Sequence, residues 1–182
     1  MPPEASTIPL YLAPMSGVSD LPFRLLAKEC GADVTITEFT SSAALTRDVA
    51  QSWLRLESDE RETPFIPQIF GGNLDEMVNT VKLLQDRADI IDLNFGCPAP
   101  KVTQACAGAA LMGAPDDLVD MVEACISVSD IPITAKLRLG TGVGQNTVVD
   151  ICKRLEEVGT MRLCVHGRTL RQGYSGVADW ET

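Results

Sequence analysis

The feature that most constrains the fold of this chain is a repeated alternation of short apolar segments with helical patterns. Strands are expected at residues 9–13, 33–37, 65–70, 90–95, 132–139 and 162–165. Between them, apolar residues recur at the i, i+3, i+4, i+7 spacing of half-buried helices, over residues 20–31, 45–56, 74–84, 118–126 and 148–158. Connections of helical length force successive strands to run parallel, because parallel neighbours need a crossover.

Two architectures contain such a parallel sheet: a doubly wound open sheet and a (β/α)8 TIM barrel. No G-x-G-x-x-G motif follows the first strand, which weakens the dinucleotide-binding form of the open sheet. Functional-looking side chains instead recur near the ends of successive strands: Met15, Glu38, Gln68, Asn94, Lys136 and His166. TIM-barrel active sites are built from such a ring. The sequence therefore predicts an α/β domain over residues 1–182 that is a TIM barrel truncated after about six strands.

Composition places the chain among reduced, globular proteins. No apolar run approaches the ~18–20 residues of a membrane span, and the amino terminus lacks the pattern of a signal peptide. The six cysteines are scattered without a C-x-x-C pair, which favours free thiols over disulfides or a zinc site. We therefore expect a soluble cytoplasmic protein that binds neither membrane nor metal.

The net charge of −10 argues against a generally basic nucleic-acid-binding surface. It describes the whole surface, however, and not one face. Four basic residues fall at or just beyond expected strand ends: Lys136, Arg138, Arg168 and Arg171. A local basic mouth on an acidic body is one interpretation, and ordinary solvated charges are the other.

The strongest candidate for a reactive group is Cys97. The apolar run from Ile90 to Phe95 is typical of a buried strand, and Gly96 and Pro98 end it in an irregular turn. Asn94 and Cys97 then lie near the carboxyl end of the strand, where parallel α/β folds bind ligands. A cysteine placed there can be oriented for reaction, although free cysteines are more often buried structural residues.

Several short motifs occur in one order along the chain. They are Ala13-Pro14-Met15, Gln68, Asn94 to Pro98, Ala107 to Leu111, Lys136 to Gly140, His166 to Thr169 and Gly173 to Gly176. Together they resemble the tRNA-dihydrouridine synthases, flavoenzymes built on an FMN-binding barrel. The resemblance spans almost all 182 residues.

The resemblance implies an oxidoreductase that reduces specific uridines in tRNA to 5,6-dihydrouridine. Reduced FMN gives a hydride to C6 of uracil, Cys97 protonates C5, and NADPH or NADH reduces the flavin. By the same resemblance, the residues that bind FMN are Pro14, Met15, Ser16, Gln68, Lys136 and His166. Asn94 and Arg138 are expected to contact the uracil.

The chain also departs from the family pattern. Gln104 and Cys106 stand where family members often have a basic residue and a glycine. The last two strands, which hold the FMN phosphate in the family, and the carboxyl-terminal helical domain that grips tRNA are expected to be absent from these 182 residues. Two alternatives stay open: a flavin barrel that reduces a free pyrimidine or orotate, and an inactive truncated barrel that acts only as a binding or interaction module.

Overall fold

The computed structural model of the protein describes residues 8–143 and 146–182. The amino-terminal residues on which the expectation about a signal peptide rests lie outside this part of the chain. The last residue of the glycine-containing loop that the sequence places at 141–144 lies outside it too.

Among the described residues, seven short strands, all paired in parallel, form the centre of the fold. They are β1 (Tyr11–Leu12), β2 (Val34–Thr35), β3 (Thr40–Ser41), β4 (Gln68–Phe70), β5 (Ile91–Asn94), β6 (Ile133–Arg138) and β7 (Arg162–His166). β1 pairs with β2, and β3 to β7 form a five-stranded sheet in sequential order. Residues 34–41 together fill one barrel position, because β2 pairs with β1, β3 pairs with β4, and Thr37 N donates to Ile66 O at 3.1 Å.

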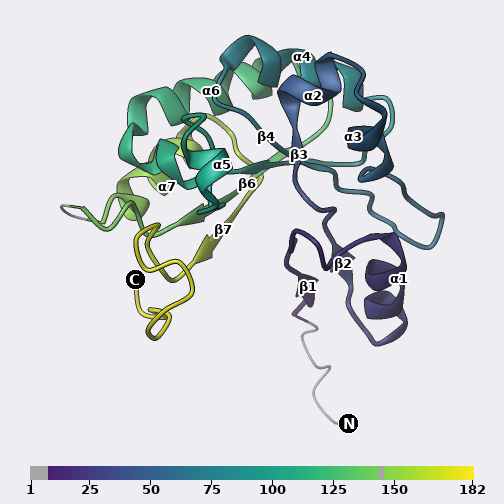
Figure 1. Cartoon of the computed structure of the whole chain (residues 1–182), viewed down its shortest axis with the longest axis horizontal. Helices are drawn as coiled ribbons and strands as arrows, with labels where there is room; N and C mark the ends of the chain where they lie inside the picture. The colour runs from purple at the N-terminus through teal and green to yellow at the C-terminus, as the bar shows by residue number, and fades with distance from the viewer. Residues whose placement is uncertain (1–7, 144–145) are drawn as a thin grey trace, which may run out of the picture.

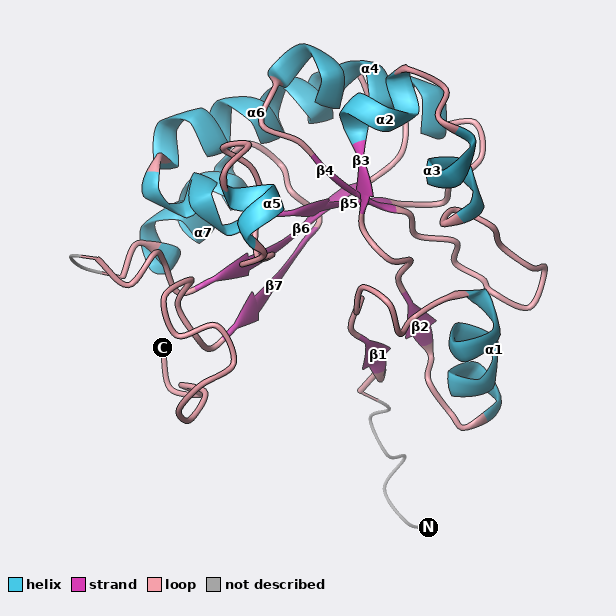
Figure 2. Ribbon diagram, in the orientation of Figure 1, coloured by secondary structure: helices cyan, strands magenta, loops and turns pink. Residues whose placement is uncertain are grey.

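Helices connect the strands, and several of them cover the outer side of this curved sheet. They are α1 (Leu21–Glu29), α2 (Ser42–Thr46), α3 (Ala50–Leu54), α4 (Leu74–Leu84), α5 (Pro100–Thr103), α6 (Pro115–Ser127) and α7 (Val148–Glu157), with a 3-10 helix η1 (Gly108–Gly113). Figures 1 and 2 show α2, α4, α6 and α7 along the convex side of the strands. The structure thus confirms a parallel α/β fold of the TIM-barrel class, and the described strands leave the barrel open, as the sequence predicts. None of the described helices has the length and apolar character that a membrane crossing requires.

The two faces of the sheet differ in chemistry because side chains alternate along each strand. Ile69, Leu93, Ala135 and Leu137 point outward into a core that includes residues of α4, α6 and α7. The alternate positions carry polar side chains on the concave face, and the parallel register sets them side by side. These pairs are Gln68 with Asp92, Asp92 with Thr134, Asn94 with Lys136, and Arg138 with His166.

The helix expected at 45–56 is two short helices, α2 and α3. Asp48 separates them in the left-handed region, with φ of 54°, a conformation that Asp tolerates better than most residues. Its carboxylate accepts a hydrogen bond from Trp53 Nε1 at 2.8 Å, which holds the break in place.

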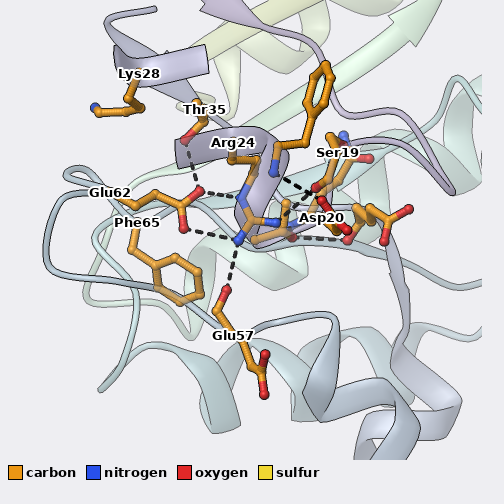
Figure 3. Close-up of polar contacts among 12 residues, drawn as sticks. Ser19, Asp20, Arg24, Lys28, Thr35, Glu57, Glu62 and Phe65 are labelled. Carbon is orange, nitrogen blue, oxygen red and sulfur yellow. Dashed lines mark hydrogen bonds and ion pairs between the residues drawn. The ribbon is translucent and has the colours of Figure 1, made fainter. Parts of the chain in front are cut away.

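The expected buried face of α1 is wrong as well. Phe23 and Leu26 are 38% and 55% exposed, and Cys30 is exposed. The buried side chain of the helix is Arg24, which is 1% exposed. A buried guanidinium needs a partner, and Figure 3 shows it paired with Glu62 from the loop before β4.

Arg24 connects three segments that are distant in the sequence. Its Nη2 donates to Glu62 Oε2 at 3.0 Å and to Glu57 O at 2.7 Å, while Thr35 Oγ1 donates to Glu62 Oε1 at 2.9 Å. Arg24 Nη1 donates to Ser19 O at 2.9 Å (Figure 3). Ser19 Oγ in turn accepts from Met15 N at 2.8 Å, so the buried ion pair fixes the loop after β1.

The two ends of the open sheet approach each other without pairing. Arg162 of β7 lies over the ring of Tyr11 of β1, with 4.4 Å from its Cζ to the ring centroid. A cavity of about 380 Å³ lies between residues 11–14 and residues 162–165. Apolar side chains stay exposed at both ends: Leu10, Tyr11, Phe23 and Leu26 at one, Val149, Met161 and Val165 at the other.

We predict that Arg24→Met lowers the free energy of unfolding by about 3–5 kcal/mol, because it leaves the Glu62 carboxylate buried without its cation. The matched control is Arg47→Met, which breaks the exposed pair with Glu76 and should cost less than about 1 kcal/mol. Urea unfolding with linear extrapolation measures both. Equal losses in the two variants would contradict the structural role assigned to Arg24.

Candidate active site

The carboxyl ends of the strands open into a cavity of about 750 Å³. Of the nine site residues predicted from the sequence, eight line it: Pro14, Met15, Ser16, Asn94, Cys97, Lys136, Arg138 and His166. They come from the loop after β1, the turn after β5, and the ends of β6 and β7. The remaining residue, Gln68, lies behind them.

The turn that carries Cys97 is held from both sides. Asn94 Oδ1 accepts hydrogen bonds from Gly96 N at 3.1 Å and Cys97 N at 2.9 Å. Cys97 O accepts from Ala109 N at 3.0 Å. Gly108 makes this approach possible, since its φ is 57° and a Cβ there would lie 2.8 Å from Cys97 O.

The Cys97 side chain is buried in the cavity wall. Burial raises the pKa of its thiol, and the Ala99 backbone amide and the positive charge of Arg138 oppose that rise only in part. The thiol is therefore protonated at neutral pH. A protonated thiol can donate a proton and is a poor nucleophile.

Gln68 is fully buried, and both ends of its carboxamide are used within the protein. Its Nε2 donates to Asp92 Oδ2 at 2.6 Å, and its Oε1 accepts from Asn94 Nδ2 at 2.7 Å. It does not line the cavity, although its Nε2 has a second hydrogen that no described residue accepts. Its contact with a flavin stays a prediction.

Lys136 and Arg138 bring positive charge to the cavity. Lys136 is half-buried, and its ammonium makes no hydrogen bond or ion pair with any described residue. Arg138 is buried and donates through Nε to Gly96 O at 2.6 Å and through Nη1 to Thr169 O and Gly173 O at 3.1 and 2.8 Å. Its Nη2 is left without an acceptor among these residues. The cavity lining includes no carboxylate from the described part of the chain.

His166 is a neutral imidazole in this setting. Burial, followed by the positive charges of Arg138, Lys136 and Arg168, lowers its pKa to about 4. Arg168 Nη1 lies 3.2 Å from His166 Nε2. Because Arg only donates, Nε2 is the acceptor and Nδ1 carries the proton.

Two residues of the site are not among those predicted from the sequence, Asp92 and Tyr174. Asp92 stands two positions before Asn94, so period-two alternation could have placed it on the same face of the strand. Tyr174 is 79% exposed, and its ring lies 5.9 Å from that of His166 and 5.6 Å from Arg138 Cζ. An aromatic residue within the motif Gly173-Tyr174-Ser175-Gly176 is the sequence feature that could have indicated Tyr174 as a site residue. No cluster of three or more metal-ligating side chains lies among the described residues.

The pKa of His166 is directly testable because it is the only histidine. We predict a midpoint of about 4 in a proton NMR titration of the imidazole of the untagged chain. The unfolded chain then binds more protons than the folded chain between about 6.5 and 4, so stability falls as pH is lowered through that window. Arg168→Gln should raise the midpoint, and Arg47→Gln, which alters an exposed distant charge, should not. A midpoint near 6.5 would contradict this environment.

The protonation of Cys97 gives a second test. Because the thiolate is the nucleophile, we predict that alkylation of Cys97 by iodoacetamide rises with pH at a midpoint above that of a free thiol in solution. Arg138→Gln should move this midpoint upward, since the Arg138 charge favours the thiolate. Peptide mass spectrometry separates Cys97 from the exposed Cys30, Cys106 and Cys164. A midpoint below that of the free thiol would exclude a stably protonated Cys97.

Comparison with known proteins identifies the family of this chain. The family model for dihydrouridine synthases matches residues 11–182. A probable tRNA-dihydrouridine synthase of Rhizobium leguminosarum bv. phaseoli is 43% identical over 173 residues, which cover 94% of this chain and 54% of that protein. tRNA-dihydrouridine synthase B of Proteus vulgaris is 37% identical over 175 residues, covering 95% and 54%. The chain spans about half the length of these curated relatives. It belongs to the dihydrouridine synthase family.

Proposed function

We propose that this chain is the catalytic, FMN-binding portion of a tRNA-dihydrouridine synthase. It reduces specific uridines in tRNA to 5,6-dihydrouridine, with NADPH or NADH as the reductant. The observation that carries the proposal is Cys97, a thiol that burial keeps protonated in the wall of a cavity lined by Lys136 and Arg138. Membership of the family supports the same reaction.

The residues around the cavity fit the ring of a flavin. Pro14 and Met15 offer an apolar wall, and the cavity has the volume of a typical cofactor site. The free ammonium of Lys136 suits the edge of a ring that accumulates negative charge on reduction. Ser16 and His166 complete this set, His166 beside the flavin or its phosphate, and Gln68 is proposed to donate the second hydrogen of its Nε2 to the ring. FMN, when bound, supplies the hydride for C6 of uracil.

Cys97 supplies the proton that completes the reduction. Saturating the C5–C6 double bond requires a hydride at C6 and a proton at C5. The S–H bond of Cys97 breaks as the C5–H bond forms, which leaves a thiolate. The positive charge of Arg138 stabilises this thiolate, and water returns the proton afterwards.

Asn94 and Arg138 are the proposed contacts for the uracil. Arg138 Nη2 and the second hydrogen of Asn94 Nδ2 are donors that no described residue uses, and both residues line the cavity. The carbonyl oxygens of uracil are acceptors of matching kind. A uridine has to leave its stack in the RNA to reach them, as base-modifying enzymes require.

The test begins with the visible absorption spectrum of the purified chain, with and without added FMN, followed by uridine reduction in tRNA. We predict that the chain retains FMN and that Cys97→Ala lowers the rate of reduction by about 10²–10⁴-fold without loss of FMN. Cys106→Ala is the matched control, because Cys106 is exposed and does not line the cavity. Lys136→Met should weaken FMN retention.

Other outcomes separate the alternatives. Failure of the chain to bind FMN would exclude catalysis by this chain alone. It would favour the alternative of an inactive barrel that acts as a binding or interaction module. A chain that reduces orotate or a free pyrimidine, and leaves tRNA unchanged, would favour the other flavin barrel. Full activity in Cys97→Ala would remove Cys97 from the reaction.

A further inference from the structure

The buried carboxylate of Asp92 takes no part in the reaction proposed above. It lies on β5, two residues before Asn94, and is 1% exposed. Its Oδ2 accepts from Gln68 Nε2 at 2.6 Å, and its Oδ1 accepts from Thr134 Oγ1. Arg162 Nη2 lies 3.9 Å from Oδ1. A charge buried this deeply is costly unless it is paired and hydrogen-bonded.

The hydrogen bonds from Asp92 form one continuous line to Cys97. Asp92 accepts a hydrogen bond from Gln68 Nε2, and Gln68 Oε1 accepts one from Asn94 Nδ2 at 2.7 Å. Asn94 Oδ1 then accepts hydrogen bonds from the backbone amides of Gly96 and Cys97. Every side chain in the line is buried. The line therefore joins the interior of the sheet to the turn at the cavity.

The order of donors and acceptors along this line allows one orientation of each carboxamide. Asn94 must turn its oxygen toward two backbone N–H groups, so its nitrogen faces Gln68. Gln68 must then present its oxygen to Asn94, so its own nitrogen faces position 92. Position 92 therefore needs an acceptor, and an ionised carboxylate accepts and never donates.

We propose that Asp92 is a positioning residue that fixes the carboxamides of Gln68 and Asn94 and, through them, the turn that holds the Cys97 thiol. This inference rests on the proposed function in one respect only, the use of that thiol as proton donor. The charged groups that face Asp92 are Arg162 and Lys136. Burial raises the pKa of Asp92, while Thr134, Gln68 and these two cations oppose the rise.

The first test replaces Asp92 by Leu, which is similar in size and cannot accept a hydrogen bond. We expect Cys97 to be alkylated by iodoacetamide about tenfold faster than in the wild-type chain, because loss of one hydrogen bond in the line releases the turn. The matched control is Thr134→Val, which removes the other hydrogen bond to Asp92 and leaves the line to Cys97 intact. It should lower the midpoint of urea unfolding and leave Cys97 alkylation within about twofold of wild type.

A second pair of variants decides the matter if Asp92→Leu does not fold. Gln68→Glu sets two carboxylates against each other and should accelerate alkylation of Cys97. In the double variant Gln68→Glu with Asp92→Asn, the contact again has one donor and one acceptor, but residue 92 now donates and residue 68 accepts. The introduced amide nitrogen donates to the introduced carboxylate, and the introduced amide oxygen still accepts from Thr134. Alkylation in this double variant should return toward the wild-type rate.

Two results would overturn the proposal. One is a wild-type rate of Cys97 alkylation in both single variants, Asp92→Leu and Gln68→Glu. The other is an acceleration of Cys97 alkylation in Thr134→Val equal to that in Asp92→Leu. These readouts need neither FMN nor tRNA, so they are independent of the proposed function. If Cys97→Ala keeps its activity while the alkylation results hold, the role of Cys97 fails and the positioning role of Asp92 stands.

Discussion

The pairing of buried polar side chains on the concave face of the parallel sheet is the constraint on which this site depends. The outer face of the same strands packs against α4, α6 and α7. The inner positions hold Gln68, Asp92, Asn94 and Thr134, all buried. Buried polar groups are costly when unpaired, and these four are linked to one another by hydrogen bonds. Their mutual satisfaction selects a single arrangement, and it ends at the amide of Cys97.

A second, separate network builds the opposite wall of the cavity. Arg24 is buried against Glu62 and holds Ser19, and Ser19 holds the loop that contains Met15. Arg138 then ties the turn at Gly96 to the loop that ends at Gly173. The cavity is therefore shaped in part by side chains that do not line it, such as Arg24 and Gln68. We expect substitutions at such positions to act on the site through the backbone.

The parallel α/β class could be predicted from the sequence, and eight of the nine candidate residues named from it line one cavity in the structure. This was possible because the carboxyl ends of parallel strands meet at one edge, whatever the details of packing. The sequence predicted the helix α1 but not which of its side chains are buried. Helical periodicity marks an apolar stripe, whereas the ion pair that buries Arg24 joins residues 38 positions apart and leaves no periodic signal. The orientation of Gln68 was equally inaccessible, since it depends on Asp92 and Asn94 of the neighbouring strand β5.

The charge of the cavity differs from the charge of the whole chain. The net charge is −10, yet the described lining of the cavity contains Lys136 and Arg138 and no carboxylate. The two titratable groups beside these cations are held neutral, the Cys97 thiol by a raised pKa and His166 by a lowered one. Burial drives both shifts, and the cations strengthen only the second. No carboxylate in the described lining offsets these two cations, although Asp92 faces Lys136 from outside the lining. A positive potential of this kind suits the proposed reaction, which builds negative charge on a bound ring.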